Sequence, residues 1–586
     1  MFFDFKSKVQ SIFDFYKSSA SIKEAYLRSI DIGDGDVLLP VGYCHQNDDD
    51  LINKLTNWRN KNVTVFPTQF LAENKSTKKW LKATVLDNPG RILFLVVNSS
   101  GVSVGHIGFN NCTSDDQSFE IDNVIRGDSQ SKGIFSKALN GICEWARTIL
   151  PVNSFHLRVM NENVTAISFY ERNGWIKDKL IPLKKTVENG IVSYVETNQF
   201  ENADAQFLRM IYSPKVNPSE SLILTAGPSI SALESSYAYD AAKYGWNSSW
   251  SKYLSRFEHE FAEYVGADYA LATSSCTGAL QIALMTLDIG PGDEVIVPDE
   301  TWVATANAVR YVGATPVFAD IELDSWNIDA KSVENLITSK TKAIMPVHMY
   351  GHPARMDAIV NLAKKFDLYI VEDAAPAIGA EWKGQRCGTF GDFAGFSFQG
   401  AKLLVTGEGG MLVTSNKDLY EKAKKIWDQG RNPNKVFWID ADGVKFKMSN
   451  VQAAIGLGQI QRADELIEMK RRVFSWYEEG LAEVPGVHLN KEVEGARSIY
   501  WMSSIYLDQS IDISREHLID SLRKQNVDTR PVFPAISQYP IWPCKQETQP
   551  TALLVGQRAM NLPSGVCLRR DEVMYACEKI REILGK

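Results

Sequence analysis

Short apolar runs in the second half of the chain alternate with stretches of helical periodicity. Continuous apolar runs predict buried strands, whereas apolar positions spaced three or four residues apart predict amphipathic helices. In chain order, the predicted elements are strand 295–298, helix 302–312, strand 315–321, strand 343–347, helix 356–366, strand 368–373 and strand 393–398. This alternation predicts a largely parallel sheet covered by helices, and therefore an α/β fold.

The first half of the chain has a different pattern. Residues 119–125 alternate between apolar and polar, which predicts a strand, and a loop of small residues and an amphipathic helix follow it. A second strand is predicted at 155–159. Residues 1–23 have the spacing of an amphipathic helix, and residues 29–44 show no clear pattern.

A polar segment with two prolines, residues 213–221, separates the two patterns and has the composition of a linker. We therefore divide the 586 residues into an unassigned extension (1–49), an N-terminal domain (50–213), a linker (214–221) and a C-terminal domain (222–586). Large single α/β units exceed the usual length of a domain, so two domains account for the chain.

Composition narrows the class of function. With 44% hydrophobic and 23% charged residues the chain is globular, and a net charge of −8 without a basic block argues against nucleic-acid binding. The eight cysteines lack metal-ligand spacing, so no metal site is expected. We find neither a signal peptide nor an apolar stretch long enough to span a membrane, so a cytoplasmic location is expected. A small or nucleotide-linked substrate fits this composition.

Two side chains in the C-terminal half stand out chemically. Lys402 follows an apolar strand in a glycine-rich segment, where desolvation would favour a neutral, nucleophilic amine. Asp373 ends another apolar strand, at the edge where open α/β sheets bind ligands. The alternative interpretations are a solvated surface lysine and a helix N-cap. A helix starting near Thr277 would direct free amides at an anion, or would simply be capped by the adjacent serines.

From about residue 222 onwards the chain resembles the pyridoxal-phosphate-dependent aminotransferases of the DegT/DnrJ/StrS family, which act on nucleotide-linked keto sugars. The matching segments are 274–280, 290–295, 301–308, 372–375, 397–410, 448–456 and 561–565. The resemblance implies a fold of the aspartate-aminotransferase type (PLP fold type I), with a mostly parallel sheet and a smaller C-terminal α+β subdomain. It also implies pyridoxal 5'-phosphate as cofactor, L-glutamate as amino donor and a nucleoside-diphosphate sugar as substrate.

The resemblance assigns roles to individual residues. Lys402 would form the imine with the cofactor and move the proton, and Asp373 would keep the pyridine nitrogen protonated. Trp302 would stack on the ring. The phosphate and substrate positions would be Ser397, Thr277, Gly278, Asn450 from a neighbouring subunit, and Arg530. The shared site implies a homodimer. Core packing for Trp302 and a surface position for Arg530 are the alternatives.

Details of the motifs point to the perosamine-synthase branch of the family, which aminates C4 of a 4-keto-6-deoxy sugar. Relatives that remove a sugar hydroxyl have His in place of the lysine, so Lys402 favours transamination. Two positions depart from the family pattern: Pro376 replaces a polar residue and Cys276 replaces a glycine. The pair His348 and His352 either binds a ligand or forms hydrogen bonds within the fold.

Residues 50–212 resemble the GNAT superfamily of acetyl-CoA-dependent N-acetyltransferases, on two motifs. The first is a loop whose amides would hold the pyrophosphate of coenzyme A, here Gln130, Ser131, Lys132, Gly133 and Ile134, although Phe135 occupies its last small position. The second motif includes Asn163, another expected cofactor-binding residue, and Tyr170, which would protonate the departing thiolate. A core position is the alternative for Tyr170.

Acetyl transfer also requires a path for the proton of the amine. Glu120 and Asp122 lie on the same face of their predicted strand, so either is a candidate base, and a solvated polar face is the alternative. Together, the two resemblances imply an enzyme that transaminates a keto sugar and N-acetylates the product for surface polysaccharide. The competing hypothesis is an aminotransferase whose N-terminal domain only senses coenzyme A or supports assembly.

Overall fold

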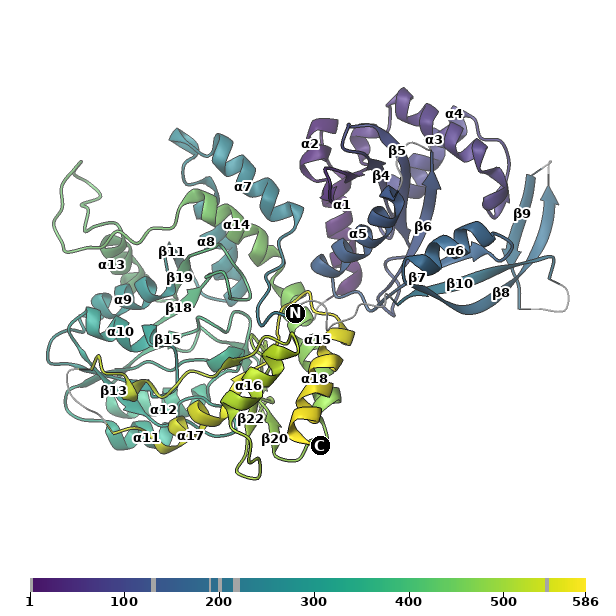
Figure 1. Ribbon diagram of the computed structural model, residues 1–586. Coiled ribbons are helices and arrows are strands. Elements are labelled where there is room, and N and C mark those ends of the chain that lie inside the picture. Colours follow the sequence, from purple (N-terminus) through teal and green to yellow (C-terminus); the bar gives the residue numbers. More distant parts are fainter. Residues whose placement is uncertain (1–3, 128–132, 189–190, 199–202, 214–221, 543–546) are drawn as a thin grey trace. The chain divides into compact units, whose positions relative to one another are not determined.

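The computed structural model describes residues 4–127, 133–188, 191–198, 203–213, 222–542 and 547–586, which form two compact units. The N-terminal unit comprises Met1–Val216 with Ser231–Ser236, and the C-terminal unit comprises the remainder. Figure 1 shows the first in purple and blue and the second in teal to yellow. Within these described ranges, no helix is long and apolar enough to cross a membrane.

The N-terminal unit is built on one sheet with ten strands in its described part, ordered β1-β2-β4-β5-β6-β7-β10-β8-β9-β3. Its central strands are β4 (Ile92–Val97), β5 (Ser103–Asn110), β6 (Ser118–Arg126), β7 (Ser154–Met160) and β10 (Ala205–Tyr212). The flanking strands are β1 (Ile30–Asp31), β2 (Val37–Pro40), β8 (Trp175–Glu188), β9 (Ile191–Glu196) and β3 (Thr68–Gln69). Within this sheet β6 and β7 pair in parallel and the other pairs are antiparallel.

The helices of this unit are α1 (Phe5–Lys17), α2 (Ile22–Leu27), α3 (Asp49–Lys61), α4 (Asn74–Trp80), continued by a π-helical turn at Leu81–Leu86, α5 (Ile134–Ile149) and α6 (Val164–Arg172). The single helix expected at 1–23 is therefore two helices, because Ser21 caps a new one by accepting a hydrogen bond from the Glu24 amide. Residues 29–44, which show no clear pattern in the sequence, supply the strands β1 and β2.

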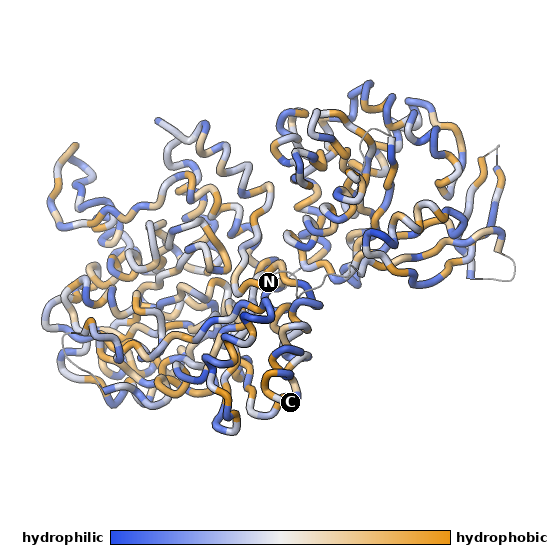
Figure 2. Tube along the Cα trace, in the orientation of Figure 1, coloured by the Kyte–Doolittle hydropathy of each residue, from blue (hydrophilic) through white to orange (hydrophobic). Residues whose placement is uncertain are grey.

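The C-terminal unit contains a seven-stranded sheet ordered β11-β19-β18-β15-β14-β12-β13. These strands are Tyr269–Thr273, Gly410–Thr414, Phe393–Ser397, Tyr369–Asp373, Thr341–Ile344, Glu294–Pro298 and Thr315–Ala319. All pairs are parallel except those that involve β19. The predicted mostly parallel sheet is confirmed, and Figure 2 shows its apolar strands inside the unit.

Helices α8 (Lys252–Val265), α9 (Cys276–Thr286), α10 (Ala304–Tyr311), α11 (Ala330–Leu336), α12 (Met356–Phe366), α13 (Lys417–Trp427) and α14 (Asn450–Gln461) accompany this sheet, and α7 (Ala232–Tyr244) precedes them. Helix α12 has the predicted bounds. The helix expected at 302–312 begins instead at Ala304, because residues 299–303 form a loop. Trp302 consequently lies outside the helix.

A smaller α+β subdomain completes the C-terminal unit, as expected. Its four strands are β20 (Val487–Leu489), β22 (Ser504–Leu507), β24 (Ala559–Asn561) and β23 (Arg530–Pro531). Helices α15 (Ala463–Leu481), α16 (Arg515–Lys524) and α18 (Arg570–Leu584) pack against them around a separate apolar core that includes Tyr477, Leu518 and Ile580. The remaining elements are α17 (Pro550–Arg558) and the three-stranded sheet β17 (Gln385–Arg386), β16 (Glu381–Trp382) and β21 (Ala496–Arg497).

Candidate active sites

Asp373 is the last residue of β15 and is 5% exposed. Its Oδ2 accepts a hydrogen bond from Thr305 Oγ1 at 2.7 Å, and its Oδ1 accepts one from the Ala375 amide at 3.2 Å. Burial raises the pKa of the Asp373 carboxyl, while these hydrogen bonds and the charge of Lys402 oppose the rise. Residues 374–380 form turns rather than a helix, so Asp373 is not a helix N-cap.

Lys402 lies in a bend after β18, with its Nζ 3.8 Å from the centroid of the Trp501 ring. Desolvation lowers the pKa of Lys402 to about 8, although the charge of Asp373 raises it. The indole Nε1 of Trp501 donates to the Ala401 carbonyl at 2.8 Å, which holds the ring beside the lysine. Lys402 is therefore not a solvated surface lysine, and its neutral form is more populated than that of an exposed lysine.

Trp302 is 57% exposed, so core packing does not explain it. Its ring centroid lies 5.3 Å from that of Phe533, which stacks on Tyr350 at 5.7 Å, and Tyr350 stacks on Trp501 at 5.8 Å. A row of four aromatic rings thus runs from Trp302 to the ring beneath Lys402. Tyr350 has a φ of 51°, a left-handed backbone conformation that is unusual for an aromatic residue and is concentrated at functional sites.

The predicted phosphate-binding turn is the start of α9. Ser275 caps this helix, because its Oγ accepts the Gly278 amide at 3.1 Å, so that amide is already engaged. The half-buried Thr277 lies in the first turn, where backbone amides lack partners within a helix. Gly278 leaves room for Phe446, whose ring would be 3.0 Å from a Cβ at that position. Ser397, at the end of β18, is 7% exposed.

Two further predicted residues, Asn450 and Arg530, lie in different surroundings. Asn450 is the first residue of α14, and its Oδ1 accepts the Tyr253 amide at 2.9 Å. Its Nδ2 has no hydrogen-bond partner among the residues described. Arg530 is on β23 with its side chain 69% exposed, and its Nη2 lies 3.8 Å from Asp528 Oδ2. Both side chains retain capacity to bind a further group.

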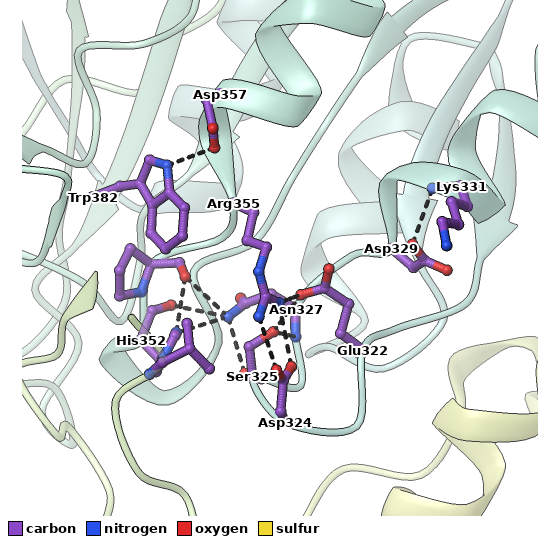
Figure 3. A network of polar contacts seen from close by, with 12 residues as sticks. Glu322, Asp324, Ser325, Asn327, Asp329, Lys331, His352, Arg355, Asp357 and Trp382 are labelled. Carbon is purple, nitrogen blue, oxygen red and sulfur yellow. Dashed lines mark hydrogen bonds and ion pairs between the residues drawn. The ribbon is translucent and has the colours of Figure 1, made fainter. Parts of the chain in front are cut away.

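The two histidines noted in the sequence are bonded within the fold. His348 Nε2 lies 3.0 Å from Glu372 Oε2, and its Nδ1 accepts the Ala354 amide at 3.1 Å. His352 lies in the polar network drawn in Figure 3, where its Nδ1 lies 3.3 Å from the Asn327 side-chain amide. In the described part of the chain, no group of three His, Cys, Asp or Glu side chains could hold a metal ion.

The polar network in Figure 3 ties the loop after β13 to the start of α12. Arg355 contacts Glu322 and also forms an ion pair with Asp324 at 2.8 Å between Nη2 and Oδ2. Asn327 Oδ1 accepts the Met349 amide at 2.8 Å, which supports the backbone next to Tyr350. This network therefore supports the backbone next to the strained residue of the aromatic row.

In the N-terminal unit, Glu120 and Asp122 on β6 both form ion pairs. Glu120, 6% exposed, accepts two hydrogen bonds from Arg158, at 2.6 and 3.1 Å. Asp122 pairs with Arg91, and it lines a cavity of about 490 Å³ together with Arg91 and Arg158. Glu120 therefore does not belong to a solvated polar face, whereas the Asp122 side chain is 34% exposed. Burial raises the pKa of the Glu120 carboxyl, and the hydrogen bonds and charge of Arg158 oppose that rise.

Tyr170, the predicted general acid, lies on α6 and is 8% exposed. Burial and the nearby charge of Asp122 raise the pKa of its hydroxyl well above the usual value. The hydroxyl therefore stays protonated at neutral pH and can donate. Asn163 is the N-cap of the same helix, with its Oδ1 accepting the Ala166 amide at 3.1 Å, so this side chain has a structural task.

The predicted loop for coenzyme A is partly described. Gln130, Ser131 and Lys132 lie outside the described residues, whereas Gly133 caps α5 with a φ of 86° and Ile134 is buried as its first residue. Phe135 points into the core, where the absence of a side chain on Gly105 makes room: a Cβ there would lie 2.5 Å from the Phe135 ring. The large residue at this motif position is thus accommodated by packing inside the unit.

Several contact residues were not identified from the sequence. Thr305 lies in a matching segment, but only the fold shows its bond to Asp373, 68 positions away. Trp501, Tyr350 and Phe533 come from separate segments, and nothing local to each segment predicts that their rings stack. His106 of β5 lines the N-terminal cavity, and a single histidine on an apolar strand carries no specific signal.

Comparison with known proteins agrees with these geometries. Residues 228–581 match the model of the DegT/DnrJ/EryC1/StrS aminotransferase family, and residues 45–176 match a GNAT acetyltransferase domain. The chain is 41% identical over 355 residues to a GDP-perosamine synthase of Escherichia coli O157:H7, covering 61% of this chain and 96% of that protein. It is 39% identical over 363 residues to a GDP-perosamine synthase of Caulobacter vibrioides, covering 61% and 98%.

Solved structures give the same result for the C-terminal unit. The aminotransferase TlmJ from Streptoalloteichus hindustanus superposes with a TM-score of 0.58 at 28% identity, over 62% of this chain and 99% of that chain. An aminotransferase from Psychrobacter cryohalolentis gives a TM-score of 0.57 at 28% identity, over 61% and 98%. The chain therefore belongs to the DegT/DnrJ/EryC1/StrS aminotransferase family of sugar-nucleotide aminotransferases, and it carries a GNAT acetyltransferase domain before the aminotransferase domain.

Proposed function

We propose that this chain is a bifunctional enzyme that aminates a nucleoside-diphosphate-linked 4-keto-6-deoxy sugar at C4 and then N-acetylates the new amine. L-Glutamate would donate the amino group and acetyl-CoA the acetyl group. The observation that carries the first half is the buried Lys402, whose pKa the charge of buried Asp373 influences, together with the match to GDP-perosamine synthases over nearly their whole length. The GNAT match and Tyr170 support the second half.

The residues at the C-terminal site fit pyridoxal phosphate. A carboxylate buried without an ion pair, such as Asp373, is stabilised by a cationic ring nitrogen. Lys402 has the lowered pKa that a covalent link to an aldehyde requires, and exposed Trp302 offers a flat surface. Thr277 and Ser397 would hold the phosphate. The cofactor, when bound, supplies an electron sink for the substrate carbon.

Lys402 would carry out the proton transfers of the amination. Desolvation lowers the pKa of its amine to about 8, and the neutral form would take the proton from the carbon of the amino donor and return one to the sugar carbon. Thr305 keeps Asp373 oriented through its 2.7 Å hydrogen bond. The aromatic row from Trp302 to Trp501 forms an apolar wall of the site, which limits the access of water.

We further propose how the parts are divided and assembled. Residues 50–213 would act as the acetyltransferase and residues 222–586 as the aminotransferase, joined by the linker 214–221. Two copies would share the aminotransferase site, with Asn450 serving the partner's cofactor phosphate, and its unpartnered Nδ2 supports this role. Arg530, exposed on β23, would contact the diphosphate or the sugar. The acetamido sugar would serve surface polysaccharide synthesis.

The experiment is a set of incubations read by mass spectrometry. Purified protein loaded with pyridoxal phosphate receives a GDP-linked 4-keto-6-deoxy hexose with glutamate, with and without acetyl-CoA. We expect the amine without acetyl-CoA and the acetamido sugar with it. The Tyr170→Phe variant should accumulate the amine, because general acids contribute roughly 10²–10⁴-fold to rate.

Isothermal titration with acetyl-CoA separates the two halves of the proposal. No heat of binding and no acetamido product would leave an aminotransferase with a non-catalytic N-terminal domain. Unchanged keto sugar in every incubation would refute the aminotransferase half for this substrate, and a panel of dTDP- and UDP-linked keto sugars then tests the nucleoside.

A further inference from the structure

The N-terminal unit contains a cavity of about 490 Å³ with an unusual charge balance. Its wall is formed by α3, the segment 66–72, α4, Arg91 just before β4, and the strands β5, β6 and β7. Figure 1 shows where these elements lie in the unit. The charged residues that line it are three arginines, Arg59, Arg91 and Arg158, and one carboxylate, Asp122. The volume is within the range of small-ligand sites, and the surplus of positive charge favours an anionic ligand.

Of these three arginines, Arg59 is the one with no carboxylate partner in the described part of the chain. Arg91 pairs with Asp122, and Arg158 is occupied by Glu120. Among the described residues Arg59 has no ion pair, and its Nε has no hydrogen-bond partner. A half-buried guanidinium in this state has donors left for a ligand anion, for which its planar geometry suits phosphate oxygens.

Neighbouring residues hold Arg59 in position. Its Nη2 donates to the Thr68 carbonyl at 3.0 Å. Its guanidinium carbon lies 4.3 Å from the ring centroid of Phe66 and 4.5 Å from that of Phe70. These contacts fix the side chain before a ligand binds, so little conformational entropy is lost when one arrives.

His106, on β5, provides a proton acceptor in the same cavity. It is 4% exposed, and its Nδ1 has no hydrogen-bond partner among the described residues. A hydrogen bond links the ring to the backbone of Asn123, where β6 bulges and Asn123 has a φ of 53°. Desolvation lowers the pKa of His106 to about 4, so the imidazole is neutral at pH 7.

The pKa of the predicted acid, Tyr170, is influenced by a residue of the cavity wall. The charge of Asp122, a cavity-lining residue, contributes to the raised pKa of the Tyr170 hydroxyl. The unit thus supplies a proton donor on α6 and, in the cavity that Asp122 also lines, a neutral imidazole acceptor on β5. Acyl transfer to an amine needs this combination, since one proton leaves the amine and another goes to the leaving group.

We propose that this cavity is the acceptor site for a nucleoside-diphosphate-linked amino sugar, with Arg59 binding the diphosphate and His106 Nδ1 accepting the proton of the amine. The inference rests on the proposed acetyltransferase function and names its base and its anion contact. The neutral amine nitrogen bonds to the carbonyl carbon of a coenzyme A thioester, and the carbon–sulfur bond breaks. His106 Nδ1 takes the amine proton, and the Tyr170 hydroxyl gives its proton to the sulfur. His106 then releases its proton to solvent, and the Tyr170 oxygen takes up a proton from solvent.

The base is tested with His106→Gln, which retains a donor for the Asn123 backbone and loses the Nδ1 lone pair. The substrates are GDP-perosamine, the expected amine, and acetyl-CoA, with release of the free thiol as the signal. We expect kcat to fall about 10²–10³-fold with both KM values unchanged. The control is His156→Gln, which alters another imidazole of the same sheet whose Nδ1 is unpartnered but which does not line the cavity.

A second variant guards against misfolding. In His106→Ala, added imidazole should restore part of the rate, because the vacated space lies against the cavity. Wild-type activity in His106→Gln would overturn the role of His106. Loss of activity in His106→Ala without rescue, together with an unchanged far-ultraviolet circular dichroism spectrum, would also count against it.

The anion contact is tested with Arg59→Gln on two acceptors, GDP-perosamine and the methyl glycoside of the same amino sugar. We expect the KM for the GDP-linked acceptor to rise about ten- to a hundredfold, as for loss of a charge-assisted hydrogen bond, while the KM for the glycoside stays the same. The control is Arg147→Gln, since Arg147 also stacks on two aromatic rings, those of Phe155 and Tyr212, outside the cavity.

Equal effects on the two acceptors would overturn the diphosphate assignment. Absence of acyl transfer by the wild-type protein with every acceptor would refute the proposed acetyltransferase function itself. Transfer by the wild type that survives both variants would refute only the present inference.

Discussion

The two units organise their chemistry in different ways. In the C-terminal unit, Asp373 ends the apolar strand β15 and Lys402 follows the apolar strand β18, and each belongs to a contiguous motif. In the N-terminal unit, the cavity is lined by Arg59, His106 and Asp122 from three separate elements, none of which is part of a compact motif. Parallel strands end at one edge of a sheet and gather strand-end residues there, whereas a mainly antiparallel sheet joins side chains across strands.

This difference predicts how separable the activities are. Each site is lined by residues of its own unit, so a substitution in one should leave the chemistry of the other intact. It also predicts which substitutions reduce activity most. Transamination depends on one atom, the Nζ of Lys402, whereas acetyl transfer depends on several side chains of the N-terminal unit.

The largest effect is expected for Lys402→Ala. Transamination of the GDP-linked keto sugar should fall by about 10⁴-fold or more, since the nucleophile itself is removed. Acetyl transfer to added GDP-perosamine should continue at the wild-type rate. The visible absorbance of bound cofactor should also be lost, whereas Lys383→Ala, which alters an exposed lysine near the Trp382 ring, should retain it. Parallel loss of both activities would break the comparison between the units.

Asp373→Asn should have the next largest effect. The variant would lose the charge that faces the ring nitrogen of bound cofactor, and breaking a buried pair costs about 3–5 kcal/mol, which corresponds to a fall of roughly 10²–10⁴-fold in transamination. The matched control is Asp392→Asn, at a carboxylate of the same sheet that accepts the Ile370 amide at 2.9 Å. Steady-state rates with saturating cofactor measure the effect, and a fall of similar size in the control would assign it to folding instead.

The pH dependence of cofactor capture should report the pKa of Lys402. Because that pKa is lowered to about 8, the neutral fraction and hence the rate should rise about tenfold per pH unit below pH 8 and level off above it. Stopped-flow absorbance of the cofactor-free protein mixed with pyridoxal phosphate measures the rate. A rise that continues to pH 10 would indicate an ordinary, solvated lysine.

The smallest catalytic effect is expected for Glu120→Gln. The loss of its bonds to Arg158 should reduce the free energy of unfolding by roughly 1–2 kcal/mol, with allowance for the exposed side of the arginine. Acetyl transfer should change less than about threefold, since His106 is the proposed base. Glu196→Gln, at the more exposed partner of Arg158, should cost less than about 1 kcal/mol. A fall as large as that of His106→Gln would make Glu120 the base.

Prediction from sequence succeeded where local pattern and chemistry coincide. Apolar runs gave the parallel strands, and helix α12 was predicted with its observed bounds, because burial of one face sets both periodicity and position. The helix expected to begin at Trp302 begins two residues later, at Ala304, because apolar periodicity does not reveal the loop in which the Trp302 ring is exposed. The helix expected at 1–23 was likewise broken by the cap at Ser21.

The amino-acid sequence alone identified the family, the α/β class, and Lys402 and Asp373 as candidate site residues, because these inferences depend on contiguous residues. Only the tertiary structure decided that Glu120 and Asp122 are paired with arginines, that Thr305 and Trp501 support the motif residues, and that His106 retains a free lone pair. These contacts join residues far apart in the chain, and hydrogen-bond partners across strands depend on register and bulges, which no local pattern specifies.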